Sequence, residues 1–265
     1  MCIRDSHYPD LKLFGGNLMD IWKYYDITHK KHLVCNPMNK DKLEGLFSLL
    51  DIKPGSKVLD IACGKGEPLI RLAELFNISG TGVDLSPYFI KDCEKKKNER
   101  VPNSDIKLLE MDGAKYKPEN NELFDLVMCI GASWIYNGFK GTINALKKMT
   151  KPNGLLIIGE PYWLKEPDDE YLKMSGLKKE EFNSHYKNID TGEKEELNCI
   201  YTLVSSHDDW DHYETLQWWS AYDYVTVNPD DPDNSELLNK INKAKTEYLL
   251  YGRDTLGWAI YVFKR

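Results

Sequence analysis

The segment from residue 57 to residue 67 constrains the fold of this chain more than any other. It reads KVLDIACGKGE, a short apolar run that ends at an acid, followed by a turn with two glycines and then a helical pattern. An acid at a strand end, next to glycines that leave the backbone bare, is how an α/β sheet builds a nucleotide-type site. The segment therefore predicts an open α/β sheet with a ligand site at the ends of its strands.

Two common glycine motifs do not match this segment. The dinucleotide motif G-x-G-x-x-G needs a third glycine where Leu69 stands, and its first position is Ala62 if Gly64 is taken as the second. A phosphate-binding P-loop needs Ser or Thr after Gly-Lys, whereas Lys65 is followed by Gly66. The segment therefore disfavours an NAD-dependent oxidoreductase and a P-loop enzyme.

Short apolar segments alternate with helical patterns between residues 57 and 159. The predicted strands are 57–61, 80–84, 106–109, 124–130 and 155–159. The predicted helices are 68–76, one that starts at Ser86, and 143–149, with two amphipathic helices, 18–26 and 40–50, ahead of the first strand. This alternation predicts a mostly parallel sheet with right-handed crossovers and helices on both faces.

The last hundred residues depart from this alternation. Strands are expected at 199–205 and 256–263, and the connection between them is far longer than a hairpin loop of about 2 to 5 residues. Its predicted helices are 210–224 and 235–251. We expect the insertions 162–197 and 207–255, with lid helices in 17–53, to form a mostly helical cap. Residues 17–265 are then a single domain, and residues 1–16 are expected to be a disordered leader.

Composition and net charge limit the kinds of molecule that this protein is expected to bind. The formal net charge of −7 and the pI of about 5.5 disfavour nucleic acid. The six cysteines include no C-x-x-C pair, which favours free thiols in a reducing cytoplasm over disulfides or a zinc site. No apolar run approaches the ~20 residues that span a membrane. The sequence indicates no metal, no membrane partner and no particular oligomeric state.

Three acids follow three consecutive predicted strands: Asp60, Asp84 and Asp112. One such acid alone could be an exposed loop residue, but three at one sheet edge favour a ligand site. Together with the Asp-x-small-Cys-Gly-x-Gly turn, they resemble the class I S-adenosylmethionine (AdoMet) methyltransferases. Later segments, GASWI, GEPYW, DWDHY and GRDTLGW, resemble a poorly characterised bacterial group of these enzymes. The resemblance runs from about residue 28 to the C-terminus.

This resemblance implies a seven-stranded, Rossmann-like methyltransferase sheet whose last strand is antiparallel. It implies AdoMet as cofactor and S-adenosylhomocysteine as product. Asp60 would organise the glycine turn, Asp84 would accept hydrogen bonds from the ribose, and Asp112 would accept one from the adenine amine. The spacing of Asp84 from the glycine turn, about 20 residues, suits a ribose acid. The other expected cofactor contacts are Ala62, Cys63, Gly64, Gly66, Leu85, Met111, Gly113, Ile130 and Gly131.

The acceptor site is less defined. The Asn/Asp-Pro-Pro-Tyr/Phe tetrapeptide of base N-methyltransferases is absent after the fourth strand, and Asn36-Pro37 is no substitute in sequence. An aromatic wall could hold an apolar or cationic group, although core packing explains the rings equally well. Its expected rings are Trp134, Tyr136, Tyr162, Trp163 and Trp210.

Three further sites each have two possible interpretations. Arg253 could bind an acceptor carboxylate or form a surface ion pair, and His32 could contact the acceptor or the cofactor. The acids 208–209 are interpreted as a helix cap in preference to a metal site.

The sequence thus predicts a methyltransferase that modifies N, S or O of a small-molecule acceptor. No catalytic residue can be named, since the activated methyl group needs a base only for a protonated nucleophile. A protein or RNA methyltransferase and a non-catalytic AdoMet-binding regulatory module remain the alternatives.

Overall fold

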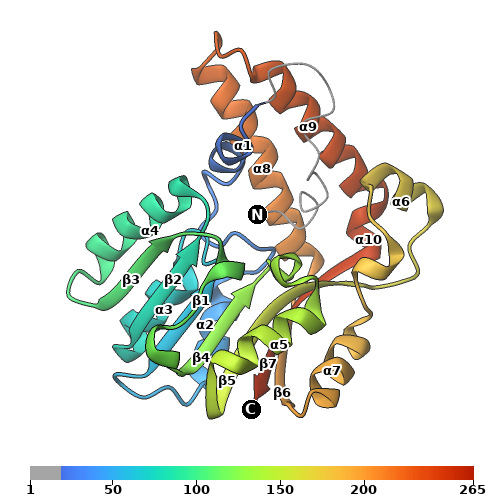
Figure 1. Cartoon of the computed structure of the whole chain (residues 1–265). Coiled ribbons are helices and arrows are strands. Elements are labelled where there is room, and N and C mark those ends of the chain that lie inside the picture. The colour runs from blue at the N-terminus through green and yellow to red at the C-terminus, as the bar shows by residue number, and fades with distance from the viewer. Residues whose placement is uncertain (1–18) are drawn as a thin grey trace.

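A seven-stranded sheet runs through the molecule in the order β3-β2-β1-β4-β5-β7-β6 (Figure 1). The computed structural model describes residues 19–265, and the expected leader 1–16 lies outside the described residues. The strands are β1 (Lys57–Ile61), β2 (Ser79–Asp84), β3 (Asp105–Glu110), β4 (Phe124–Ile130), β5 (Thr150–Trp163), β6 (Asn198–Val204) and β7 (Leu256–Lys264). All neighbours are parallel except β7, which is antiparallel to β5 and β6. The predicted fold class is confirmed.

Helices cover both faces of this sheet. The α-helices are α1 (Ile21–Thr28), α2 (Lys40–Leu49), α3 (Glu67–Phe76), α4 (Pro87–Arg100), α5 (Phe139–Met149), α6 (Asp169–Ser175), α7 (His185–Lys194), α8 (His207–Val227), α9 (Asn234–Glu247) and α10 (Arg253–Thr255). Apolar residues of α2, α3 and α4 pack in the core on one face, and those of α5 and α7 pack on the other. The sheet is therefore shielded from water on both sides, as a mostly parallel sheet requires.

The strand order sets the position of the ligand site. The chain moves outward from β1 to β2 and β3, and then returns to place β4 on the other side of β1. In open α/β sheets, ligands bind at the carboxyl ends of the strands where the order reverses. The ends of β1, β2 and β3 carry Asp60, Asp84 and Asp112 side by side along this edge.

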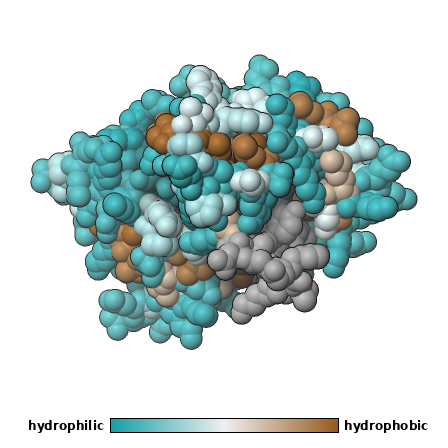
Figure 2. Space-filling view, turned by 90° about the horizontal axis from the view of Figure 1, so that it is seen from above, coloured by the Kyte–Doolittle hydropathy of each residue, from teal (hydrophilic) through white to brown (hydrophobic). Residues whose placement is uncertain are grey.

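A helical layer formed by α1, α8 and α9 stands above the carboxyl ends of the strands (Figure 1). The surface seen from that side is mainly hydrophilic, with a band of hydrophobic residues across it (Figure 2). The connection between β6 and β7 is helical, as its length and aromatic content predict. Helix α8 begins earlier than expected because Ser206 accepts from the Asp209 N–H and the Asp209 carboxylate accepts from the Ser206 N–H. The N-cap residue is therefore Ser206, and Asp209 caps the same helix end as the third residue of the capping box.

Strand β5 differs most from its predicted extent. It covers Thr150–Trp163 and not only 155–159, because β7 pairs with it as far as Trp163 opposite Leu256. Tyr162 and Trp163 consequently lie inside the strand and not after it. Successive strand residues face opposite sides of a sheet, so these two rings pack into different cores.

Two helices also differ from their predicted bounds. Helix α5 begins at Phe139, four residues before the expected start, directly after Gly138 in a positive-φ conformation. Helix α9 ends at Glu247 and continues as a π-helical turn, Tyr248–Gly252. A π-turn has no simple sequence signature, so the sequence predicted one uninterrupted helix over residues 235–251.

Candidate active site

Asp60 lies at the end of β1 and is almost completely buried, with 1% of its surface exposed. Burial, together with the nearby Asp84 carboxylate, raises its pKa well above the usual range. Its Oδ2 has no hydrogen-bond partner among residues 19–265. A buried, unpartnered carboxyl oxygen is costly unless a ligand supplies a donor or a positive charge. Asp60 is therefore suited to a cationic or hydrogen-bonding ligand group.

The turn after β1 packs more tightly at one glycine than at the other. Ala62, Gly64 and Gly66 all have positive φ, which glycine adopts without strain. A side chain on Gly64 would be in ordinary contact with Cys35, whose nearest atoms are 3.9 Å away. A side chain on Gly66 would overlap the Cys93 sulfur of α4. Gly66 is therefore needed for the close approach of α4, whereas Gly64 lines the narrow cavity described below.

Asp84 connects the ends of β1, β2 and β3. Its carboxylate accepts hydrogen bonds from the Gly64 and Ser86 N–H groups, both at 2.8 Å. The Met111 N–H donates to the Asp84 carbonyl at 2.9 Å. Asp112 accepts from the Ala114 N–H at 3.0 Å and begins a short 3₁₀ turn that includes Gly113. The acids of β2 and β3 are thereby held in fixed orientations at the sheet edge.

A narrow cavity of about 30 Å³ lies between the glycine turn and the end of β4. Its lining includes the predicted residues Asp60, Ala62, Cys63, Gly64, Ile130 and Gly131. A cavity of this volume has room for about two water molecules. The segment 33–36 covers it from the N-terminal side.

The glycine turn is tied to the N-terminal segment by a buried lysine. Lys65 is 4% exposed, and its Nζ donates to the His29 carbonyl at 2.8 Å and lies 3.1 Å from Asp92. His29 is itself buried, and its Nε2 lies 2.9 Å from the Tyr213 hydroxyl of α8. Burial lowers the pKa of His29 well below its usual value, so its ring is neutral at neutral pH. The end of α1, the glycine turn and α8 therefore form one connected unit.

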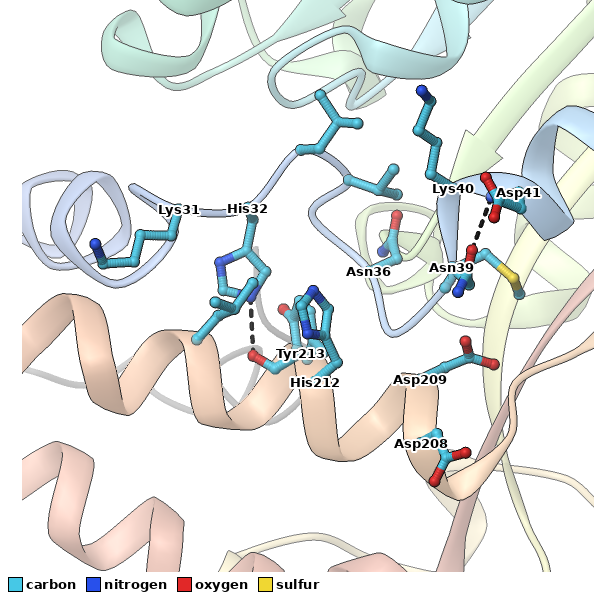
Figure 3. Close-up of a pocket in the computed structure, with 14 residues that line it drawn as sticks. Lys31, His32, Asn36, Asn39, Lys40, Asp41, Asp208, Asp209, His212 and Tyr213 are labelled. Atoms are coloured by element: carbon cyan, nitrogen blue, oxygen red, sulfur yellow. Dashed lines mark hydrogen bonds between the residues drawn. The ribbon is translucent and has the colours of Figure 1, made fainter.

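A second and larger cavity, of about 530 Å³, lies between residues 31–41 and the first turns of α8 (Figure 3). His32 lines it, with its Nε2 2.8 Å from the Tyr213 carbonyl and its Nδ1 without a partner. Burial lowers the pKa of His32 to about 4. The lining combines the apolar side chains of Leu33, Val34, Met38 and Leu216 with the polar residues Lys31, Asn36, Asn39, Lys40, Asp41, Asp208, Asp209 and His212.

The structure does not gather the predicted acceptor residues around this cavity. The Trp163 Nε1 donates to the Lys179 carbonyl at 2.8 Å, and Trp210 stacks on Tyr248. Tyr162 packs over Gly257, where no side chain would fit. These three rings are buried in the cores, which is the packing alternative stated for the aromatic residues.

Two further predicted residues lie after β4, and one lies on the cap. Trp134 is 43% exposed, and the Tyr136 hydroxyl donates to the Gly113 carbonyl at 3.0 Å. Arg253 pairs with Asp211 of α8, with Nε and Nη2 each 2.9 Å from a carboxylate oxygen. Its guanidinium thus forms the ion pair that the sequence left as the alternative. Of the predicted acceptor contacts, only His32 lines the larger cavity.

Sequence reasoning did not single out Glu160. This β5 residue is 2% exposed, and its carboxyl is hydrogen-bonded to Ser133. Burial raises the pKa of Glu160 to about 8, so the carboxyl is protonated at neutral pH. Its Oε2 has no partner among the described residues. The signal in the sequence was an acid directly after the apolar run of a predicted strand.

Residues 19–265 contain no group of three or more His, Cys, Asp or Glu side chains placed to hold a metal ion. Over the same residues, no helix combines the length and the apolar character that crossing a bilayer requires.

Known proteins resemble this arrangement. A family model described as a methyltransferase domain matches residues 58–154. The uncharacterized protein YjhP of Escherichia coli (strain K12) is 30% identical over 248 residues, which cover 92% of this chain and 98% of that protein. The chain belongs to the class I AdoMet-dependent methyltransferases. The X-ray structure of YjhP superposes on 92% of this methyltransferase and on 100% of that chain, with a TM-score of 0.85.

Two other relatives inform the cofactor and the acceptor. An AdoMet-dependent methyltransferase from Geobacter sulfurreducens, in complex with S-adenosyl-L-homocysteine, is 27% identical with a TM-score of 0.86. The match covers 94% of this chain and 100% of that chain. The 27-O-demethylrifamycin SV methyltransferase of Amycolatopsis mediterranei (strain S699) is 28% identical over 123 residues, 45% of this chain and 43% of that protein.

AdoMet is the cofactor of this methyltransferase, and the chemistry of the strand-end residues suits it. The unpartnered Asp60 oxygen suits a positively charged group, and Gly64 lines the narrow cavity beside it. The Asp84 carboxylate lies one strand further along the same edge, with hydrogen-bond capacity left on both oxygens.

Proposed function

We propose that this methyltransferase modifies N, S or O of a small-molecule acceptor that enters beneath α8. The observation that carries the proposal is the position of the 530 Å³ cavity, which shares Leu33, Val34 and Asn36 with the narrow cavity at the glycine turn. Helices α1, α8 and α9 stand over the strand ends (Figure 1), and a covered edge favours a small acceptor over a polymer. The net charge of −7 also disfavours RNA. The partial relative that acts on demethylrifamycin SV, a small molecule, supports the same class.

The residues of the sheet edge would bind the cofactor in an extended pose. We propose that Asp84 accepts hydrogen bonds from the ribose and that Asp112 accepts one from the adenine amine. The narrow cavity is much smaller than AdoMet, so binding would require part of its lining to move apart. AdoMet supplies an activated methyl group, and the protein then accelerates transfer by positioning the acceptor and excluding water.

The free thiols of Cys35, Cys63, Cys93, Cys129 and Cys199 support a reducing, cytoplasmic location.

Radiolabelled AdoMet tests the proposed acceptor class. The purified protein is incubated with it and with a cell extract separated into a low-molecular-weight filtrate and a macromolecular fraction. We expect label to appear in the filtrate, with S-adenosylhomocysteine as the second product. Label that enters only RNA or protein would contradict the small-molecule proposal. AdoMet binding without turnover in either fraction would instead indicate a regulatory module.

A further inference from the structure

The wall between the two cavities is one short segment. Leu33, Val34 and Asn36 line both the narrow cavity at the glycine turn and the 530 Å³ cavity under α8. Figure 3 shows the Asn36 side chain between the His32 side and the Asn39 side of the larger cavity. A molecule bound in this cavity would therefore meet Asn36 before it reached the end of β4.

The Asn36 amide is placed against bare backbone. Gly131, directly after β4, has φ +84°, and any side chain there would overlap the Asn36 amide nitrogen. Within residues 19–265, no hydrogen bond occupies the Asn36 side chain, which is only half-buried. Asn36 thus places an amide without a hydrogen bond beside Gly131, although the two residues are far apart in the sequence.

His32 supplies a second unused group to the same cavity. The ring is 6% exposed, and the hydrogen-bond network assigns the proton to Nε2, which faces the Tyr213 carbonyl at 2.8 Å. Nδ1 is then an acceptor, and it is buried without a partner. Such an atom costs free energy unless a ligand offers it a donor.

The charges around the cavity favour a positively charged molecule. Lys31 pairs with Asp223 at 2.8 Å, and Lys40 pairs with Glu44 at 3.5 Å, both partners lying outside the lining. Asp41 and Asp208 have no ion pair among the described residues. The lining therefore carries uncompensated negative charge, which attracts cations.

Building on the proposed function, we propose that the larger cavity is the acceptor site and that the acceptor is a small amine with a second hydrogen-bond donor. The Asn36 side-chain carbonyl would hold the nucleophilic nitrogen, and His32 Nδ1 would accept from the second group. An amine bound as ammonium first releases a proton to water. The nitrogen lone pair then forms the N–C bond while the C–S bond breaks. The electron pair of that bond stays on sulfur, the positive charge passes to nitrogen, and a further proton leaves to water.

Chemical capping of the acceptor pool tests the amine. The low-molecular-weight filtrate is treated with acetic anhydride to block amines, or with iodoacetamide to block thiols, before incubation with protein and labelled AdoMet. We expect amine capping to abolish methyl transfer and thiol capping to leave it. Transfer that survives amine capping would overturn the amine assignment while leaving the small-molecule function intact. Absence of any transfer to the untreated filtrate would overturn both proposals.

Three variants test Asn36. Asn36→Leu removes the carbonyl at similar size, and Asn36→Asp keeps an oxygen acceptor but loses the donor. We expect Asn36→Leu to lower kcat/KM for methyl transfer to the low-molecular-weight filtrate by about 10- to 100-fold, because the N–H group of the bound amine then loses its hydrogen bond. Asn36→Asp keeps an oxygen that can accept this bond and should retain most of the kcat/KM. Asn103→Ala, in the exposed turn before β3, is the matched control.

AdoMet affinity and thermal stability distinguish positioning from structure. Because Asn36 also lines the narrow cavity, calorimetry should give AdoMet Kd values that are similar for Asn36→Leu and Asn36→Asp. The two variants and the Asn103→Ala control should have similar unfolding midpoints. Equal losses for Leu and Asp, accompanied by weaker AdoMet binding or lower stability, would overturn the role of Asn36 in holding the acceptor.

Discussion

At the scale of single residues, Asp60 and Asp84 mark the carboxyl edge of the sheet. Both follow apolar runs, and a parallel sheet brings such positions to one edge, so the sequence predicts them. Glu160 also follows an apolar run, but its burial cannot be inferred from that pattern, and Asn36 carries no comparable signal. Asn36 reaches Gly131 only because the N-terminal segment folds back over β4, and Glu160 becomes neutral only because β5 and its surroundings bury it.

Asp84 gives a direct test of the cofactor edge. Asp84→Asn removes the charge and leaves one oxygen for two N–H groups that now donate to the carboxylate at 2.8 Å. A hydrogen bond to a charged group contributes about 1.5–3 kcal/mol, so we expect AdoMet affinity to fall by roughly 10- to 100-fold. Isothermal calorimetry measures this change.

The matched control is Asp105→Asn, at the amino end of β3, where the carboxylate accepts from the Ser79 hydroxyl at 2.6 Å. Its distance from the ligand edge predicts unchanged affinity. If both variants bind AdoMet equally well, Asp84 does not contact the cofactor.

At the scale of elements, local patterns located the strands and helices but not the pairing that extends them. The apolar run at 124–130 matches β4 at both ends, because this buried central strand is apolar at every position except Asp125. The end of β5 depends on β7, which is about a hundred residues further along the chain. The capping box at the start of α8 joins Ser206 to Asp209, so the helix begins before the first aspartate of the sequence pattern.

The packing of α3 against α4 predicts a strong effect at one glycine. Gly66→Ala introduces a left-handed alanine and a clash with Cys93, whereas Gly176→Ala has the same kind of φ, +77°, with no atom within 4 Å. We expect about 1 kcal/mol of lost stability at Gly176 from backbone strain. At Gly66 we expect about 1–3 kcal/mol more from overpacking. Denaturant unfolding measures both.

The double variant Gly66→Ala/Cys93→Ala separates the two causes. Removal of the Cys93 sulfur should recover part of the overpacking loss, which appears as a coupling free energy in a double-mutant cycle. Additive losses would show that Gly66 is required for its backbone conformation alone.

At the scale of the whole molecule, two buried titratable groups make stability depend on pH in opposite directions. His32 has a folded pKa of about 4 against 6.5 for the free side chain, so the unfolded chain binds more protons between these values. Stability is therefore lost as pH falls from about 6.5 to 4. Glu160 has a folded pKa of about 8 against 4.5, so the folded chain binds more protons in that window. The contribution of Glu160 to folding stability is complete below about pH 4.5 and is lost as the pH rises toward 8.

Glu160→Gln isolates the second effect, because glutamine keeps the shape and stays neutral at every pH. At pH 5 the buried carboxyl is already protonated, so wild type and variant should have similar stability. At pH 8 the wild type should be less stable relative to the variant by up to about 4 kcal/mol, since each pKa unit corresponds to about 1.4 kcal/mol. Denaturant unfolding of both proteins at the two pH values gives this difference. Glu110→Gln, an exposed glutamate at the end of β3, should show no such pH dependence. A constant difference between wild type and Glu160→Gln across this range would mean that Glu160 is ionised in the folded protein, and its carboxylate would then have to be stabilised by a charge that the fold of residues 19–265 does not supply.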